Sequence, residues 1–150
     1  MKKIENFQHI RSDGTVLDPQ ITPEQIEATG WRPLKIIRIQ WESEGRTFRI
    51  DDSSGLLADL LPGGVGITVQ SDKGRNLSVI NPDGSLRFKI PTTQTINGTP
   101  REGRFCGSDS PRSKFPDRFA VLFETLPDYH RWVLEIDALT GKTVDSWWTK

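Results

Sequence analysis

The feature that most constrains the fold is a series of short alternating segments separated by tight turns. The clearest example is VINPDGSLRFKIP, residues 79–91, in which an Asn-Pro-Asp-Gly turn separates two strand-like segments. In the second segment Leu86, Phe88 and Ile90 alternate with basic residues, so we expect these three side chains to face inward. A chain rich in such hairpins is expected to fold as an antiparallel sheet.

Similar patterns recur along the chain. LKIIRIQW and RTFRI flank the turn ESEG, which predicts a hairpin, and GITVQ and NLSVI lead into the segment above. Near the end, FAVLFET is apolar on both faces, as in a central strand, RWVLEID alternates, and GKTVDSWW follows the turn ALTG. The inward positions of these strands predict a buried set: Ile37, Ile39, Phe48, Leu86, Phe88, Val121, Phe123, Trp132, Leu134 and Ile136.

Helical signals are few. Thr22 as N-cap, Pro23 in the first turn and Gly30 as the stop predict a helix of two turns at most. SSGLLADLLPGG is either a second short helix or a buried apolar corner. The segment Pro91–Asp117 has almost no periodicity, which predicts a long loop.

Together these segments predict a mainly β, or α+β, fold of about seven or eight strands with one or two short helices. A curved antiparallel sheet, a sandwich or an open barrel fits this pattern. The length of 150 residues suits a single domain, residues 1–150, and five Trp and seven Phe provide large core side chains.

Charge and cysteine content limit the classes of partner. Twenty basic residues balance twenty acidic ones, so the chain lacks the long-range field that attracts nucleic acid or anionic membranes. A loop strip of basic and aromatic residues is the one candidate for nucleic acid: Arg101, Arg104, Phe105, Arg112, Lys114, Phe115 and Arg118. No apolar run approaches the roughly 20 residues of a membrane helix, MKKIENFQHIR lacks a signal-peptide core, and the cysteine is single. We therefore expect a cytoplasmic protein that binds neither nucleic acid nor membrane.

The sequence contains no recognisable cofactor or metal motif. LPGGVG lacks the ending of a phosphate loop, and neither His9 nor His130 has a second ligand at metal-binding spacing. Cys106 is expected to be an inert thiol. We predict no cofactor, no metal and no catalytic residue. The alternative is a small enzyme whose unrecognised site uses His130 with Asp128 and Glu135.

Two groups of residues are candidates for contact with a protein partner. Carboxylates cluster around the first hairpin, and two adjacent tryptophans end the last strand, where alternation points their rings to opposite faces. The candidate contact residues are Glu42, Glu44, Asp51, Asp52, Trp147 and Trp148. The carboxylates have a second interpretation, as solvated charges that discourage edge-to-edge aggregation.

Three motifs, DGTVLDPQITPEQIEATGW, NPDGSLRFKIP and LEIDALTGKT, resemble those of small bacterial immunity proteins of polymorphic and type VI secretion systems. The resemblance implies a non-enzymatic cytoplasmic protein that binds one cognate toxin domain and blocks its active site. It carries over no site residue. A further alternative is a carrier that holds a small ligand within an open β-barrel lined by Trp and Phe.

Overall fold

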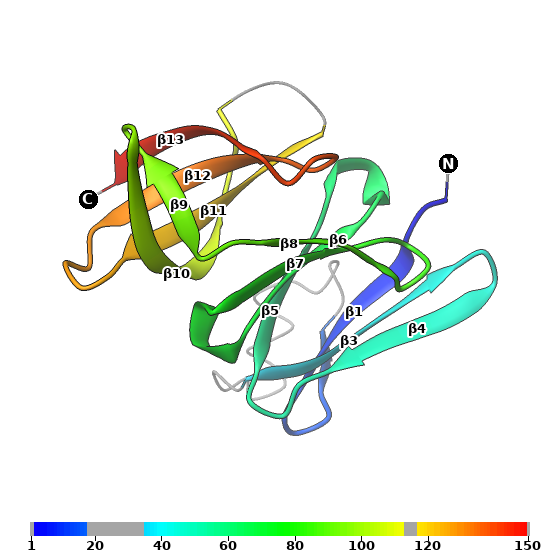
Figure 1. Ribbon diagram of the computed structural model, residues 1–150. Coiled ribbons are helices and arrows are strands. Elements are labelled where there is room, and N and C mark those ends of the chain that lie inside the picture. Colours follow the sequence, from blue (N-terminus) through cyan, green and yellow to red (C-terminus); the bar gives the residue numbers. More distant parts are fainter. Residues whose placement is uncertain (1, 18–34, 113–116, 150) are drawn as a thin grey trace.

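Three antiparallel sheets make up the computed structural model, which describes residues 2–17, 35–112 and 117–149 (Figure 1). These residues form thirteen strands, so the mainly β fold with a curved antiparallel sheet is confirmed, although the expected seven or eight strands were too few. The described helical elements are two 3-10 turns, Pro62–Gly64 (η1) and Asp72–Gly74 (η2). The helix predicted from Thr22 to Gly30 lies outside the described residues.

The first sheet has the order β2-β1-β3-β4 and contains the predicted hairpin. Its strands are β1 (Glu5–Arg11), β2 (Val16–Leu17), β3 (Ile36–Ser43) and β4 (Arg46–Asp51). Glu44 and Gly45 join β3 to β4 with φ angles of 50° and 76°, the left-handed pair of a tight hairpin turn. On β3, Ile39 and Trp41 are fully buried at period two.

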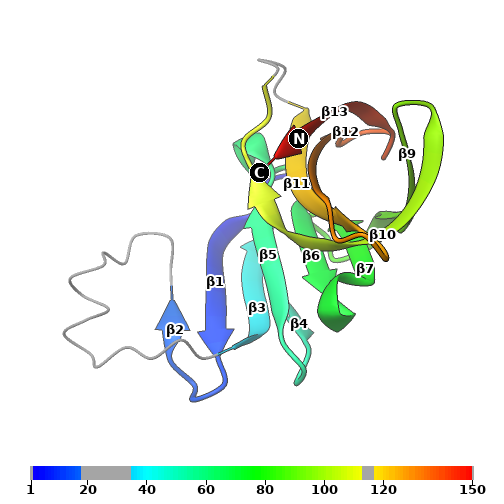
Figure 2. The same cartoon turned by 90° about the vertical axis from the view of Figure 1, so that its left-hand side faces the viewer.

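The second sheet has the order β5-β6-β7-β8 and lies between the other two sheets (Figures 1 and 2). Its strands are β5 (Leu56–Leu60), β6 (Ile67–Ser71), β7 (Asn76–Ile80) and β8 (Leu86–Ile90). Ile67 and Val69 belong to a core shared with the first sheet, whereas Leu77 and Val79 belong to a core shared with the third. Both faces of this sheet are therefore buried.

Strand β5 corrects one prediction. The helix considered for SSGLLADLLPGG is wrong, because Leu56 and Ala58 are buried at period two and pair with β6. A helix would have placed these two residues 200° apart around its axis, whereas a strand places them on one face. The Gly-rich segment that follows is the turn η1.

The third sheet curls into a half-barrel, as Figure 2 shows, with the order β13-β12-β11-β10-β9. Its strands are β9 (Thr93–Ile96), β10 (Thr99–Asp109), β11 (Arg118–Thr125), β12 (Arg131–Asp137) and β13 (Thr143–Thr149). Across the open side, Thr143 Oγ1 donates a hydrogen bond of 2.6 Å to Gln94 Oε1. Side chains such as Phe105, Phe123 and Leu134 fill the interior of the half-barrel.

The long loop predicted for Pro91–Asp117 is wrong, because most of this segment forms β9 and β10. Asn97 and Gly98 make a two-residue hairpin turn with φ angles of 51° and 80°. Gln94 and Ile96 are buried between exposed threonines, which is the alternation of a half-buried strand. Ile96 is the only large apolar side chain on β9, so hydrophobicity alone gives a weak signal.

Most of the residues that were predicted to be buried are buried or half-buried in the structure. The fully buried members are Ile39, Val121, Phe123, Leu134 and Ile136, and the half-buried ones are Ile37, Phe48, Phe88 and Trp132. The prediction for Leu86 is wrong, since this residue is 54% exposed. A bulge shifts the register so that Val79 pairs with Phe88 but Ile80 pairs with Leu86. Cross-strand partners share a face, so the bulge turns Leu86 to the opposite face from Phe88.

Two contacts join η2 and β6 to β10. The Gln70 side chain donates to Gly107 O at 2.8 Å and accepts from Gly107 N at 3.0 Å, at a bulge in β10. Gly74, with φ of 85°, lies so close to β10 that a Cβ atom there would be 1.9 Å from Phe105 O. Only glycine fits at this position.

This close approach predicts a stability difference between two substitutions. Gly14 has a similar φ of 87°, but a Cβ atom there would have no described neighbour within 4 Å. Gly14→Ala should therefore lower the free energy of unfolding only through its strained left-handed backbone, by about 1 kcal/mol. Gly74→Ala should lower it by at least about 2 kcal/mol more, because the backbone of β10 must move. Urea unfolding of the two variants measures the difference, and equal losses would contradict the tight approach.

Candidate functional site

The candidate site is a surface for protein contact, and the predicted contact residues occupy two ends of the molecule. The hairpin β3–β4 extends to one side in Figure 1, and the end of β13 lies at the other. Within the hairpin, Glu42 and Glu44 lie at the turn, whereas Asp51 pairs with Arg38 at the opposite end. Glu42 and Arg38 are four positions apart on β3, a distance of about 13 Å. The structure therefore divides the carboxylates into two pairs.

Neighbouring groups engage three of the hairpin carboxylates. Glu44 Oε2 lies 3.7 Å from Lys2 Nζ, and Asn6 Nδ2 donates to Glu42 Oε2 at 2.9 Å. Asp51 accepts a short hydrogen bond from Arg38 and lies 3.3 Å from Arg49 Nε; the bond from Arg38 is the main reason why its pKa is lowered. Exposed pairs of this kind contribute little to stability, so these carboxylates can still pair with a partner.

The two tryptophans follow the predicted alternation. Trp148 is 61% exposed and pairs with Trp132, whereas Trp147 is half-buried and pairs with Val133. The Arg112 guanidinium carbon lies 4.0 Å from the centre of a Trp147 ring. Trp148 is thus the more accessible of the two aromatic side chains.

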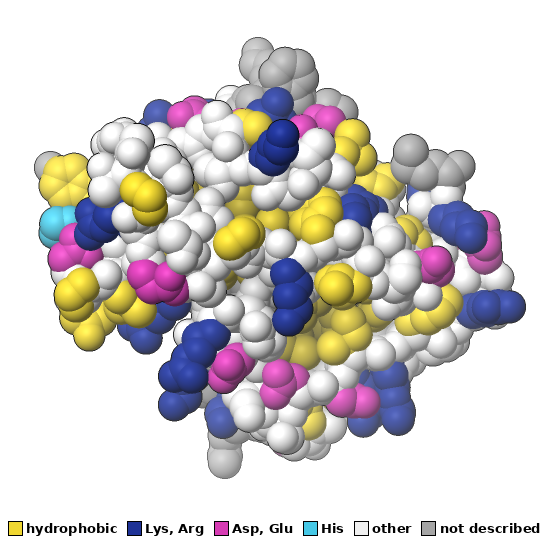
Figure 3. Space-filling view, in the orientation of Figure 1, with side chains coloured by type: hydrophobic (Ala, Val, Ile, Leu, Met, Phe, Trp, Pro, Cys, Tyr) yellow, Lys and Arg dark blue, Asp and Glu magenta, His cyan; other side chains and the backbone are white. Residues whose placement is uncertain are grey.

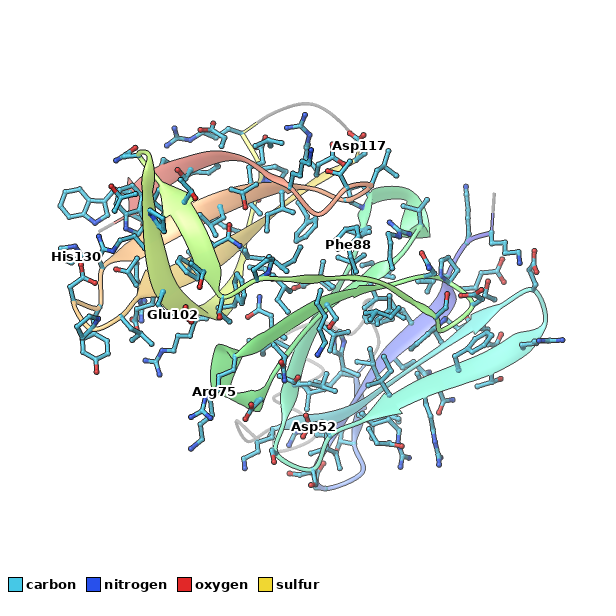
Figure 4. The ribbon with its side chains drawn as sticks, in the orientation of Figure 1. Asp52, Arg75, Phe88, Glu102, Asp117 and His130 are labelled. Atoms are coloured by element: carbon cyan, nitrogen blue, oxygen red, sulfur yellow. The ribbon has the colours of Figure 1, made fainter. Side chains whose placement is uncertain are left out.

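The cluster around His130, labelled in Figure 4, contains only part of the alternative catalytic set. His130 Nδ1 lies 3.4 Å from Asp128 Oδ2, and the His130 ring centre lies 6.0 Å from that of Trp148. Glu135 is five residues further along β12, where it is buried and lies 3.6 Å from Arg118 Nη1. The structure brings Asp128 and His130 together and leaves Glu135 apart.

Asp128 is held as a carboxylate. Thr125 Oγ1 donates a hydrogen bond of 2.6 Å to its Oδ1, and Arg101 donates a short one to its Oδ2. These two bonds lower the pKa of Asp128 to about 2, and the bond from Thr125 has the larger effect. The hydrogen-bond partners of Asp128 thus keep it ionised at lower pH than an ordinary aspartate.

Three basic residues of the strip, Arg101, Arg104 and Arg118, face carboxylates of this chain. Arg104 donates two hydrogen bonds to Glu124 Oε1, at 2.7 and 3.0 Å, and Arg131 donates a third to Glu124 Oε2 at 3.3 Å. The bonds from Arg104 are the first cause of the lowered pKa of Glu124. Lys114 and Phe115 lie outside the described residues. Nearby, burial raises the pKa of the half-buried Cys106 thiol, which agrees with an unreactive cysteine.

A mostly apolar groove of about 680 Å³ opens where β8 meets the loop before β6 and the turn between β12 and β13. Its residues are Lys2, Leu61, Pro62, Val65, Asn81, Pro82, Asp83, Arg87, Asp117, Ala138 and Leu139. Hydrophobic side chains gather at the middle of this face in Figure 3, and Figure 4 marks the region by Phe88 and Asp117. No local sequence pattern predicted this groove, because the turns that form it are far apart in the chain.

Arg87 is one of four charged residues that line the groove, although the strand pattern predicted that it faces solvent. It is half-buried and donates to Asn81 Oδ1 at 2.7 Å, Ala138 O at 3.0 Å and Val65 O at 2.6 Å. The bulge beside Leu86 changes the orientation of β8 at this point. No sequence signal predicted this bulge.

The described residues offer neither a metal-binding cluster nor a membrane-spanning helix. Residues 2–17, 35–112 and 117–149 include no group of three or more His, Cys, Asp or Glu side chains placed to hold a metal ion. Across the same ranges, no helix is both long and apolar enough to cross a membrane.

Comparison with known proteins identifies a structural relative. No protein-family model and no curated protein matches the chain. One chain in the structure of Tne2 in complex with Tni2 has the same fold, with a TM-score of 0.89 and 26% sequence identity. The match covers 98% of this chain and 99% of that chain. It supports the resemblance to toxin immunity proteins that the sequence motifs indicated.

The environment of Asp128 predicts a measurable titration. Because its folded pKa of about 2 is below the ordinary aspartate value of 3.8, ionised Asp128 stabilises the fold above about pH 4, and this contribution is lost as the pH falls toward 2. Thr125→Val removes the hydroxyl donor and should raise the pKa of Asp128 toward 3.8. Carbon-detected NMR titration measures the midpoint of the Asp128 carboxyl in the wild type and in the Thr125→Val variant. An unchanged midpoint would show that the Thr125 bond does not hold the charge.

Proposed function

We propose that this chain is a non-enzymatic immunity protein that acts in the cytoplasm, where it binds one cognate bacterial toxin domain and blocks its active site. The observation that carries the proposal is the likeness, over nearly the whole of both chains, to a chain of the Tne2–Tni2 complex. A general immunity role is supported by that neighbour. The identity of the toxin and the blocking of its active site are the further steps of the proposal.

The architecture suits such a role. A partner that is already rigid loses less conformational entropy on binding, so more of its contact energy appears as affinity. In this fold the middle sheet is enclosed on both faces, and side chains fill the half-barrel. Buried side chains thus occupy the interior of the described half-barrel, where a carrier would need a cavity.

The contact residues are proposed as three separate groups. Glu42 and Glu44 at the tip of the β3–β4 hairpin offer negative charge, which suits a toxin whose active site is basic. Trp148 offers an exposed aromatic anchor at the opposite end. Asp51 and Asp52 form a third group, at the base of the hairpin, where Asp51 is engaged by two arginines.

The first prediction of this proposal concerns the partner. Mixing the purified chain with the toxin domain that co-purifies with it should give a one-to-one complex and abolish the toxin's activity at equimolar concentration. Calorimetry and a toxicity assay in cells that express both proteins measure binding and protection. A chain that binds no toxin domain would contradict the proposal and restore the enzyme and carrier alternatives.

The second prediction separates the contact points. Glu42→Lys with Glu44→Lys should weaken the complex by about 2 to 5 kcal/mol if these charges are desolvated at the interface. Asp51→Lys with Asp52→Lys serves as the matched double reversal at the other end of the hairpin, and Trp148→Ala tests the aromatic anchor. Calorimetry at low salt compares the three variants, with melting temperature as the folding control. If all three bind like the wild type, the interface lies elsewhere.

A further inference from the structure

Arg87 differs from Arg101, Arg104 and Arg118 because its described partners are all neutral. Its three hydrogen-bond acceptors are two backbone carbonyls and one side-chain amide oxygen. Among residues 2–17, 35–112 and 117–149, no carboxylate forms an ion pair with Arg87. Arg101, Arg104 and Arg118, in contrast, each form an ion pair with a carboxylate. Arg87 therefore has no described ion-pair partner, although Asp83 and Asp117 also line the groove.

Burial makes this charge costly. Desolvation lowers the pKa of the Arg87 guanidinium, although it stays charged at any physiological pH. An arginine carries five N–H groups, and three of those of Arg87 donate to described atoms, so two remain. An incoming carboxylate would supply both acceptors and the missing negative charge.

The guanidinium is held in place before any partner arrives. A Cβ atom at Gly66 would lie 3.0 Å from Arg87 Nη2 and 2.9 Å from Leu61 Cδ1, so the bare glycine makes room for the arginine. The three hydrogen bonds fix the orientation of the planar group from three different segments of the chain. A preorganised donor loses little entropy when it binds an acceptor.

The surroundings of Arg87 add an apolar contact. Leu139 is 67% exposed at the rim, and Pro62, Val65 and Pro82 line the same groove. Exposed leucines around a concave apolar surface are typical of protein-binding sites. The charged groups at the groove are Lys2, Asp83 and Asp117, together with Arg87 itself, so its formal charge sums to zero. Two carboxylates at the rim disfavour a polyanion, whereas a single carboxylate on an apolar segment can reach Arg87.

We propose that the cognate toxin docks on this groove through a segment that carries an apolar side chain beside a carboxylate, which pairs with Arg87. This inference rests on the proposed function and adds the chemistry of the docked segment. The apolar side chain packs against Leu139 and the prolines, and the carboxylate accepts from the two remaining N–H groups.

Leu139→Ser provides the first test, because this exposed side chain can change without disturbing the core. It should weaken the complex with the purified toxin domain by at least about tenfold. Leu57→Ser is the matched control, since Leu57 is 51% exposed but lies on β5 and outside the groove; it should leave affinity unchanged within about twofold. Calorimetry measures both variants, with melting temperatures to verify folding.

Arg87→Gln and Arg87→Lys test the charge. The glutamine variant should weaken the toxin complex by at least about tenfold and reduce its salt dependence, with the lysine variant between it and the wild type. Because Arg87 also joins three segments, a small probe tests the same chemistry in the wild-type protein. In NMR titrations, 4-phenylbutyrate should shift the amides of Val65 and Leu139 and bind several-fold more tightly than the neutral 4-phenyl-1-butanol.

The outcomes separate the two proposals. Absence of any toxin complex with the wild type would overturn the proposed function and this docking with it. A tight complex that tolerates Leu139→Ser and both Arg87 variants would overturn the docking alone. Equal binding of the acid and the alcohol, or shifts confined to other surfaces, would overturn the assignment of a carboxylate to Arg87.

Discussion

The sheet β5–β8 is covered on both faces, and this double burial governs how the other two sheets are placed. Ile67 and Val69 contact one core while Leu77 and Val79 contact the other, and each fully buried aliphatic side chain contributes about 1.5 to 3 kcal/mol. A sheet enclosed in this way can include polar residues only where they are bonded. Gln70 meets this condition through its two hydrogen bonds to Gly107, which also align β10 with the middle sheet.

The parts of the fold that could be predicted from sequence are those in which local turn chemistry and side-chain alternation agree. The hairpin around Glu44 and Gly45 and the strand Arg131–Asp137 belong to this class. The hairpin β9–β10 was missed because one face of β9 is polar, although its Asn97-Gly98 turn was a usable signal. Strand β5 was misread because a short apolar run suits either a helix or a strand until its pairing partner is known.

The candidate site was less accessible to sequence reasoning, for a physical reason. Glu42, Glu44, Asp51 and Asp52 could be identified as exposed charges, but their separation along the hairpin depends on register. The position of Arg87 depends on a bulge and on the approach of two distant turns, which no local pattern records. The alternation of polar and apolar residues along a strand predicts which face of the sheet a side chain lies on. A groove also depends on the distant segments that pack opposite that face.

The groove is built mainly from turns, and this has a consequence for how such a protein can change over time. Pro62 and Leu139 are exposed and lie in connections between strands, where substitutions disturb neither core. Connecting segments tolerate sequence change far better than the strands that they join. A lineage of such proteins can therefore alter the shape of this surface and follow a changing partner, while the three sheets beneath it stay the same.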